Sequence, residues 1–271
     1  MKLSNIFSRR NRILLRELVI TDFKLRYQGS VLGYLWSLLK PLFMFAILYV
    51  VFGHFLRVGD TVEYFSIYLL LGIVFWSFFT EATNQGLTSI VSRGDLIRKI
   101  NFPKYIIVIS GTLSALINLI LNLLIIAVFI AVANVDIKMS ALLFPLYIIE
   151  LYVFALSIAF FLSAAYVKYR DISHIWEVLL QGAFYATPIL YPVSLVIKEA
   201  SPMVAQLLLL NPVAQIIQDA RYALVTHQST TMSSLTGNIL IQLTPFAIVA
   251  VFAVYASYYF KKHSGYFSEN V

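Results

Sequence analysis

The sequence predicts an all-helical integral membrane protein, and its composition is the first reason. Of the 271 residues, 60% are hydrophobic and only 12% are charged, about half the charged fraction of an average soluble domain. The mean hydropathy is +0.83. So few charges could not cover the surface of a soluble domain of this length, which excludes an ordinary soluble enzyme. Cysteine is absent, which excludes a disulfide framework and a thiolate metal site.

Apolar stretches long enough to cross a membrane recur along the chain. A membrane helix needs about 20 largely apolar residues. Six stretches meet that length: 33–56, 62–90, 104–133, 141–167, 175–196 and 238–260. Two shorter apolar stretches, Met203–Leu210 and Val213–Val225, lie between the fifth and the sixth. Each is too short to cross, so we expect an external re-entrant hairpin between helices 5 and 6.

The whole chain reads as one membrane domain, 1–271, because it contains no long linker and no internal repeat. We divide it into a cytoplasmic and interfacial segment (1–30), a six-span core (31–262) and a cytoplasmic tail (263–271). Within the first segment, Arg9–Gln28 mixes apolar and basic residues. This mixture predicts an interfacial helix whose cations face anionic lipid.

The positive charges predict the orientation of the chain. Of the 20 Lys and Arg residues, 16 lie in the first 40 residues, in 93–104, in 168–170 and in 261–262. The other four lie in the alternate loops: Arg57, Lys138, Lys198 and Arg221. Cytoplasmic loops carry the excess of Lys and Arg. We therefore expect a multi-pass protein of the cytoplasmic (inner) membrane with both termini in the cytoplasm.

Motifs for nucleotide, metal and catalysis are missing. The chain has no G-x-x-x-x-G-K-[ST] phosphate loop and no H-E-x-x-H zinc motif. Its four histidines are far apart in sequence: His54, His174, His227 and His263. We therefore expect no catalytic residue, no metal site and no cofactor bound by this chain. The basic excess is expected to meet membrane lipids, and no nucleic-acid partner is expected.

Several sequence blocks resemble one transporter family. The blocks are Asp22–Trp36 with Lys40-Pro41-Leu42 and Val51-Phe52-Gly53, then Arg170-Asp171-Ile172, Thr187–Pro192 and Asn211-Pro212. In this order they resemble the ABC-2 family of transporter permeases. Within that family the match is to polysaccharide exporters, which move O-antigen, teichoic acid or capsule chains. The resemblance covers nearly the whole chain.

The resemblance implies a permease subunit rather than an enzyme. A second copy of the chain would complete the pathway as a homodimer. Two copies of a separate ATP-binding subunit would bind ATP and Mg and drive the transport. The implied substrate is a polysaccharide on a polyprenyl-pyrophosphate lipid, moved from the cytoplasmic to the external face.

Basic and aromatic residues mark a candidate entrance for the lipid headgroup. Arg26, Tyr27 and Lys40 precede or begin the first span, where they could meet the phosphates of the lipid-linked substrate. Plain anchoring at the headgroups explains Arg26 and Tyr27 as well, and snorkelling explains Lys40 equally well. Lys40 stands beside Pro41, which favours a kink in the helix.

Two short segments are candidates for coupling to the ATPase, as the family resemblance implies. Asp95, Leu96, Ile97 and Ile100 would form a short helix between the second and third spans, capped by Ser92, with an apolar face that has nothing of its own to pack on. The second segment is Arg170-Asp171-Ile172, with Asp171 or Ser173 as cap. The alternative is that both are ordinary basic loops.

Aromatic residues are dense in the spans and could line the pathway. By family resemblance, spans one and five form the lining, and this points to Tyr49, Phe52, Phe184, Tyr185 and Tyr191. Rings can stack on the apolar C–H faces of sugars, and tyrosine hydroxyls offer adaptable hydrogen bonds. The alternative is that these rings only pack between helices or face lipid.

Glu81 and Glu150 lie within apolar spans, where a carboxylate is costly and suggests a function. Glu150 neighbours Tyr147 and Tyr152 and could be a neutral, hydrogen-bonded acid between helices. A proton relay is the functional alternative for this pair.

Three other functions compete with polysaccharide export. An ABC-2 exporter of drugs or small lipids would need no continuous sugar-stacking lining. An integral-membrane glycosyltransferase would need clustered catalytic acids, commonly with a divalent metal. The external acids are dispersed instead: Asp60, Glu63, Asp136, Glu199 and Asp219. A secondary transporter would need more intramembrane charge and repeat symmetry.

The missing phosphate loop predicts that the purified chain alone does not hydrolyse ATP. Phosphate release is measured from a preparation shown by mass spectrometry to contain no partner subunit. Clear ATPase activity in such a preparation would contradict the permease interpretation.

Overall fold

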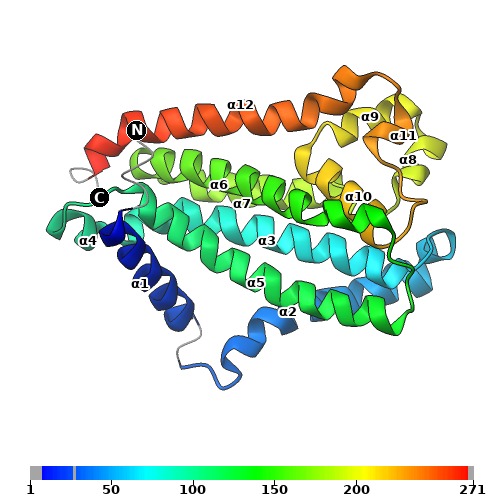
Figure 1. The fold of residues 1–271 in the computed structure, drawn as a ribbon, viewed down its shortest axis with the longest axis horizontal. Helices are drawn as coiled ribbons and strands as arrows, with labels where there is room; N and C mark the ends of the chain where they lie inside the picture. Colours follow the sequence, from blue (N-terminus) through cyan, green and yellow to red (C-terminus); the bar gives the residue numbers. More distant parts are fainter. Residues whose placement is uncertain (1–7, 27–28, 268–271) are drawn as a thin grey trace.

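The computed structural model describes residues 8–26 and 29–267, and within these ranges it contains helices and no strand (Figure 1). Five helical stretches are long and apolar enough to cross a membrane: Gly33–Phe55, Phe65–Ser92, Tyr105–Val132, Met139–Lys168 and Ile239–Tyr266. The prediction of an all-helical membrane protein is confirmed at this level.

The fifth stretch predicted from the sequence is broken. Helix α7 (Ile172–Ala186) ends after 15 residues, and α8 (Val193–Glu199) begins only after a non-helical link of turns and bends. Pro188 is the physical cause, because a proline disfavours helical geometry in the preceding residue. Thr187 accordingly adopts extended backbone angles. At 1.5 Å per residue, α7 covers about 22 Å, less than the roughly 30 Å hydrocarbon core. The prediction of one continuous membrane helix over 175–196 was therefore wrong.

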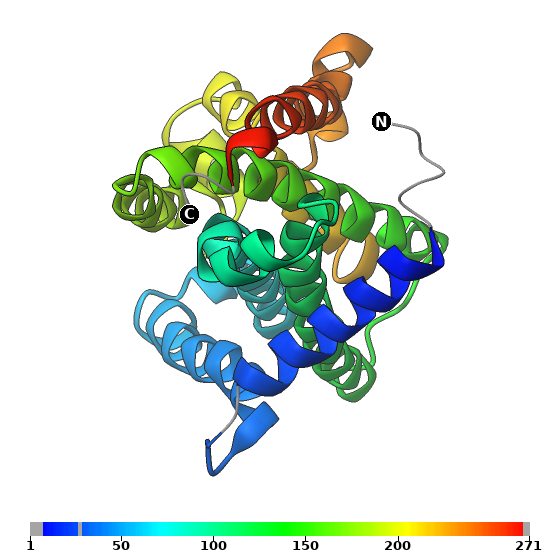
Figure 2. The same cartoon turned by 90° about the vertical axis from the view of Figure 1, so that its left-hand side faces the viewer.

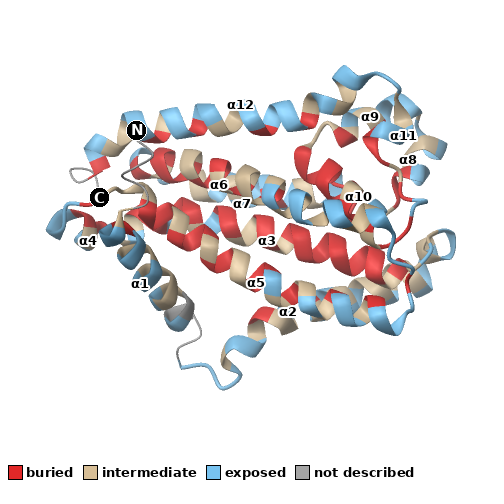
Figure 3. Ribbon diagram, in the orientation of Figure 1, coloured by how far each residue is buried: buried red, intermediate tan, exposed pale blue. Residues whose placement is uncertain are grey.

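Helix α3 (Phe65–Ser92) is the centre of the bundle. It packs chiefly against α5 (Tyr105–Val132) and α6 (Phe144–Lys168), and Figure 3 shows it buried along most of its length. Its contact with α6 is a close backbone approach at Gly86, where an added Cβ would lie 2.2 Å from Ala159 Cβ. Small residues at such a crossing let two membrane helices pack closely.

The outer helices leave broad apolar faces uncovered. Helix α2 (Trp36–Tyr49) continues into a π-helical turn (Val50–Phe55), and only 6% of its most apolar window is buried. Helix α12 (Ile239–His263) packs on α6 and is 17% buried over its corresponding window. Such faces are normal where a protein meets lipid or another chain.

Short helices close one end of the bundle. They are α8, α9 (Pro202–Leu209), α10 (Pro212–Leu224) and α11 (Met232–Leu235). Two of them have side-chain caps: Ser201 Oγ accepts from Val204 N at 3.3 Å, and Asn211 Oδ1 accepts from Val213 N at 3.0 Å. The helical segments α9 and α10 coincide with the two short apolar stretches of the sequence. Helix α10 is largely buried against α6 and α3.

The basic segments gather at the other end. Helix α4 (Gly94–Lys99), the α6–α7 corner and the end of α12 all lie there (Figure 1). Helix α1 (Arg9–Arg26) packs on α5 and lies across this end, as Figure 2 shows. Lys104 Nζ donates to the carbonyl of Ser264 at 2.8 Å, which ties the α4–α5 link to the C-terminal segment.

Sequence analysis placed Arg221 in a loop. In the structure it lies on α10 and is fully buried, where it acts as a clamp. Its Nε donates to the carbonyl of Tyr68 at 3.0 Å, Nη1 to that of Pro188 at 2.6 Å and Nη2 to that of Ile189 at 2.8 Å. The guanidinium lies 3.4 Å from the Tyr68 ring centroid. Gly72 makes room for it, because a Cβ there would lie 2.5 Å from Nη2. The link between α7 and α8 is thus held by α10.

Replacing Arg221 by Met should destabilise the protein strongly. Met keeps most of the volume but removes three hydrogen bonds from a charged donor, each contributing about 1.5–3 kcal/mol. Lys should rescue only in part, because its ammonium lacks the planar fork of donors. The measurement is membrane abundance together with the thermal unfolding temperature of the purified chain. Lys198→Ala, at an exposed cation of the same end, is the control. Wild-type stability in Arg221→Met would contradict the clamp.

Candidate functional site

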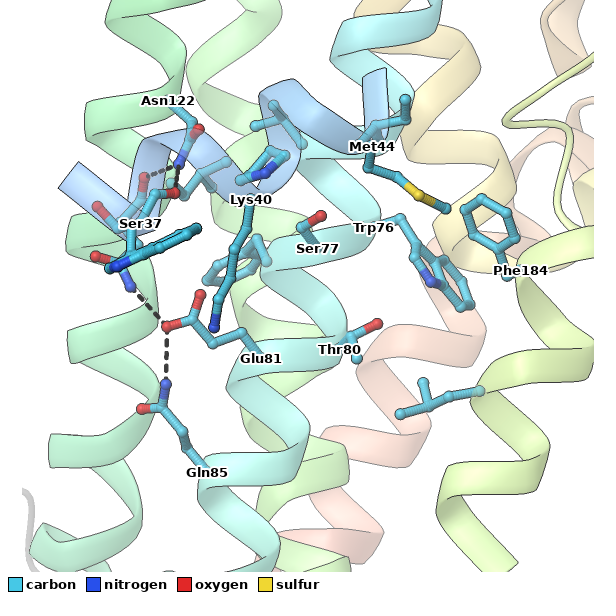
Figure 4. A pocket seen from close by; sticks show the side chains of 18 of the residues that line it. Ser37, Lys40, Met44, Trp76, Ser77, Thr80, Glu81, Gln85, Asn122 and Phe184 are labelled. Carbon is cyan, nitrogen blue, oxygen red and sulfur yellow. Dashed lines mark hydrogen bonds between the residues drawn. The ribbon is translucent and has the colours of Figure 1, made fainter. Parts of the chain in front are cut away.

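A cavity of about 1070 Å³ lies between α2, α3, α5 and α7. Its lining includes Trp36, Ser37, Lys40 and Met44 of α2, Trp76, Ser77, Thr80, Glu81 and Gln85 of α3, Asn118 and Asn122 of α5, and Phe184 and Tyr185 of α7. Figure 4 shows two kinds of wall: Lys40, Glu81 and Gln85 lie on one side, and Met44, Trp76 and Phe184 on the other.

The polar wall is organised around Glu81. Its Oε1 accepts from Gln85 Nε2 at 2.8 Å and from Asn118 Nδ2 at 2.6 Å. Asn122 Nδ2 donates to the carbonyl of Ser37 at 3.2 Å. These bonds join α2, α3 and α5, and amide donors stabilise a carboxylate in apolar surroundings. Glu81 is therefore a fixed part of the wall, while Gln85 and Ser77, which are partly exposed, offer hydrogen bonds to a ligand.

Lys40 places a positive charge inside the cavity. Its side chain extends from α2 toward Glu81, as the close-up shows (Figure 4). Among the described residues, Lys40 Nζ forms no ion pair with a carboxylate within 4.0 Å. Its side chain is exposed and faces the cavity without a salt bridge to a described carboxylate. An ammonium in this position suits an anionic group such as a phosphate.

The aromatic wall brings together rings from two helices. The Trp76 and Phe184 ring centroids are 6.0 Å apart, and those of Phe184 and Tyr185 are 5.2 Å apart and nearly perpendicular. Tyr185 is 69% exposed, so its ring is open to a ligand or to a second chain. The cavity combines apolar ring surface with polar donors and acceptors, which is the usual make-up of a ligand site.

The predicted pathway residues divide into two groups. Phe184 and Tyr185 line the cavity, whereas Tyr49, Phe52 and Tyr191 do not. Tyr49 packs against Phe65 with a centroid distance of 6.2 Å, Phe52 is partly buried against the main core, and the Tyr191 hydroxyl donates to the carbonyl of Tyr185 at 3.1 Å. The role of these three in a pathway stays a prediction.

Helical spacing explains why Tyr49 lies off the cavity. Trp36, Lys40 and Met44 follow one another at four-residue intervals and share one face of α2. Tyr49 is five residues beyond Met44, about 140° around the helix. Counting four residues in each direction from Lys40 would have identified Trp36 and Met44 as cavity residues, which sequence analysis missed. Trp76 of α3 also lines the cavity, and sequence analysis did not single it out.

The predicted entrance is only partly described. Lys40 lines the cavity, and Ser30 marks the cavity edge nearest α1. Helix α1 ends at Arg26, but Tyr27 and the side chain of Arg26 lie outside the described residues. Their role as contacts for a lipid headgroup stays a prediction.

Part of the apolar face of the candidate coupling helix α4 is buried within the chain itself. Ile97 is buried in a second core with Phe102, Ile107, Phe260 and Phe267, and Leu96 packs on its edge. The expectation of an apolar face without a partner was therefore wrong for these two residues, because the C-terminal segment folds back onto α4. Ile100 remains exposed.

The exposed face of α4 is charged. Arg98 Nη2 donates to Asp95 Oδ1 at 2.7 Å, and this hydrogen bond lowers the pKa of the Asp95 carboxyl. The cap also differs from the prediction: Arg93 occupies the N-cap position, and Ser92 Oγ donates back to the carbonyl of Ser89. Arg93 in turn forms an ion pair with Asp22, which joins α1 to the start of α4.

The second candidate coupling segment lies at the α6–α7 corner. Arg170 and Asp171 are exposed, and Ile172 begins α7. Asp171 occupies the N-cap position, but neither its side chain nor that of Ser173 caps the helix. The corner and α4 lie at the same end of the bundle (Figure 1), so one partner could contact both.

The acids Asp60, Glu63, Asp136, Glu199 and Asp219 do not form a metal centre. In the described part of the chain, no group of three or more His, Asp and Glu side chains could hold a metal ion. The cavity is therefore the candidate site.

Comparison with known proteins identifies the family. The ABC-2 type transporter family matches residues 13–225. The O-antigen export system permease protein RfbA of Myxococcus xanthus is 30% identical over 217 residues, which are 80% of this chain and 82% of that protein. Two proteins of the same name from Klebsiella pneumoniae are 28% and 27% identical over 197 residues, 72% of this chain and 74% of each.

The matched region contains the four helices that form the cavity and both candidate coupling segments. ABC-2 permeases are transport subunits rather than enzymes, and they work with an ATP-binding subunit. Together with the five apolar helices, the match makes this a multi-pass membrane protein. The chain belongs to the ABC-2 type transporter family.

Proposed function

We propose that this chain is the permease subunit of an ATP-driven exporter. Its substrate is a polysaccharide, of the O-antigen kind that the relatives' names indicate, carried on a polyprenyl-pyrophosphate lipid. The exporter moves it from the cytoplasmic to the external face of the inner membrane. The observation that carries the proposal is the cavity, in which one charged and amide-rich wall faces one aromatic wall.

The two walls suit the two chemistries of such a substrate. The lipid-linked diphosphate is anionic, and Lys40 supplies the positive charge that attracts it. Sugar rings carry hydroxyls and apolar C–H faces. Gln85 and Ser77 offer an amide and a hydroxyl to the sugar hydroxyls, and Trp76 and Phe184 offer rings to the C–H faces. None of these contacts is strong alone, so a polymer can slide through the cavity without being held tightly.

The positive charges support an orientation with both termini in the cytoplasm. Helix α1, α4, the α6–α7 corner and the end of α12 hold most of the cations and share one end. In this arrangement α7, the link after it and the buried helix α10 complete a sixth crossing beside the five long helices. The short helices α8, α9 and α11 then form the external hairpin region.

The uncovered faces support a homodimer. Helix α2 is almost unburied, and α7 exposes Ile175, Val178, Leu179 and Tyr185 beside the cavity. A second copy on this side would cover these residues and close the cavity. Two copies of the ATP-binding subunit, which hold ATP and Mg, would contact α4 and the α6–α7 corner at the cytoplasmic end.

Combined changes in the aromatic wall should abolish export where single changes only reduce it. Phe184→Ala or Tyr185→Ala alone should lower export in part, because the remaining rings still cover a sugar. The Trp76→Leu, Phe184→Ala and Tyr185→Ala triple variant should lower it at least tenfold, and Tyr185→Phe should keep more activity than Tyr185→Ala. The measurement is surface polysaccharide per copy of membrane-inserted transporter.

Tyr49→Ala is the matched control, since Tyr49 does not line the cavity and packs, partly buried, against Phe65 at the edge of the core. Large-to-small changes at packed sites cost about 2–5 kcal/mol, so Tyr49→Ala should lower the abundance of the protein more than the export per copy. If loss of abundance also explains every export defect of the cavity variants, these residues only pack between helices and the proposal fails.

A further inference from the structure

A second, smaller pocket of about 220 Å³ lies at the end of the molecule opposite α4. Three segments far apart in the sequence build it: the start of α3 with the turn before it, the start of α8, and the loop 226–230 between α10 and α11. Its volume is below the roughly 300–1,000 Å³ of pockets for drug-sized ligands. The pocket therefore has room for about one ring rather than for a chain.

Two residues that line the pocket, Tyr68 and Ser229, have buried hydroxyls without a partner among the described residues. Tyr68 is 2% exposed and Ser229 is 8% exposed, and both residues line the pocket. Neither hydroxyl oxygen has a hydrogen-bond partner among the described residues. Buried polar groups are normally satisfied, by protein, by water or by a ligand. Two such groups in one small pocket indicate that something polar completes their hydrogen bonds.

The rim of the pocket is polar and held in place. Thr226 Oγ1 donates to Glu63 Oε2 at 3.0 Å and accepts from the backbone N of Gln228 at 3.2 Å. Glu63, Gln228 and Ser194 are exposed at this rim. A carboxylate, an amide and hydroxyls thus surround the opening, and they can accept and donate several hydrogen bonds at once.

The charge of the lining selects among polar ligands. It contains no Lys, Arg or His, and its one ionisable acid is Glu63. Arg221, behind the Tyr68 ring, is buried and bound to three carbonyls, so an anion such as a phosphate or a uronic acid would meet the Glu63 carboxylate with no cation of the lining to bind. A neutral ligand with several hydroxyls fits instead. The contrast with the large cavity, where Lys40 supplies a positive charge, separates the two sites chemically.

The walls of the pocket are rigid because the Arg221 clamp holds two of them. Arg221 binds the Tyr68 carbonyl and covers the Tyr68 ring, and its other donors hold Pro188 and Ile189. This link leads directly to Pro192 and Val193, which line the pocket. A preformed site loses less entropy when it binds its ligand.

We propose that this pocket is a second binding site, which takes one neutral sugar unit through its hydroxyls. The proposal rests on the proposed function, because the sugar would belong to the exported polysaccharide after it has passed the large cavity. In the proposed orientation the pocket lies at the external end, where it would hold the leaving chain and oppose its return.

The test is a binding measurement on the purified full chain in detergent. The probes are methyl α-glucopyranoside, methyl α-galactopyranoside and methyl α-mannopyranoside, with methyl α-glucuronopyranoside as the charged counterpart. Saturation-transfer NMR titrations give the dissociation constants. At least one neutral hexoside should bind, and the glucuronoside more weakly. Ser229→Ala and Tyr68→Phe, which remove only a hydroxyl, should each raise the dissociation constant about 2–10-fold, the effect of one lost hydrogen bond.

Ser233→Ala is the matched control, because this serine is exposed at the same end and does not line the pocket. Thermal unfolding of each variant confirms that it is folded. The proposal is overturned if no neutral hexoside binds, or if Ser229→Ala and Tyr68→Phe both bind like the wild type, in which case the pocket holds only water. Since this assay measures binding and the cavity variants measure export, failure of the pocket leaves the exporter proposal to its own test.

Discussion

A single buried guanidinium holds the part of the molecule on which both sites depend. Arg221 binds three backbone carbonyls, one on α3 and two in the link between α7 and α8. Without these bonds, the link that Pro188 breaks out of the helix would have polar groups unsatisfied in apolar surroundings. The end of α7 carries Phe184 and Tyr185 into the large cavity, and the start of α8 forms a wall of the small pocket. The position of both walls follows from the same clamp.

The large cavity follows a second constraint, which is that polar groups in an apolar bundle need partners. Glu81 is held by amides of α3 and α5, and Asn122 reaches the backbone of α2. The network fixes three helices around the space and leaves Lys40 as the cation that faces it. Opposite this wall, Trp76 and Phe184 present apolar surface. The division allows one cavity to accept a charged headgroup and the sugars that follow it.

Sequence reasoning found the helices and several cavity residues for a clear physical reason, and it failed elsewhere for another. Lys40 stands out because a charge within an apolar span is unusual, and Phe184 stands out as an aromatic ring in a span. Arg221 did not, because its partners are backbone carbonyls up to 153 residues away, and carbonyls leave no mark in a sequence. Ile97 was misjudged because the cluster that buries it includes Phe260 and Phe267, near the far end of the chain. Tyr49 was chosen by residue type, but its position around α2 takes it off the cavity face, and its role in a pathway stays a prediction.

The central claim is that substrate passes between α2, α3, α5 and α7, and site-specific photocrosslinking tests it most directly. A photoreactive amino acid is placed at Ser77, which lines the cavity, and at Leu124, which is 61% exposed on the outer face of α5. The transporter works in membranes with its ATPase partner and a radiolabelled lipid-linked saccharide. The account predicts a crosslink from Ser77 that excess unlabelled substrate removes, and no such crosslink from Leu124. Competable crosslinks from Leu124 alone, in a transporter that still exports, would contradict it.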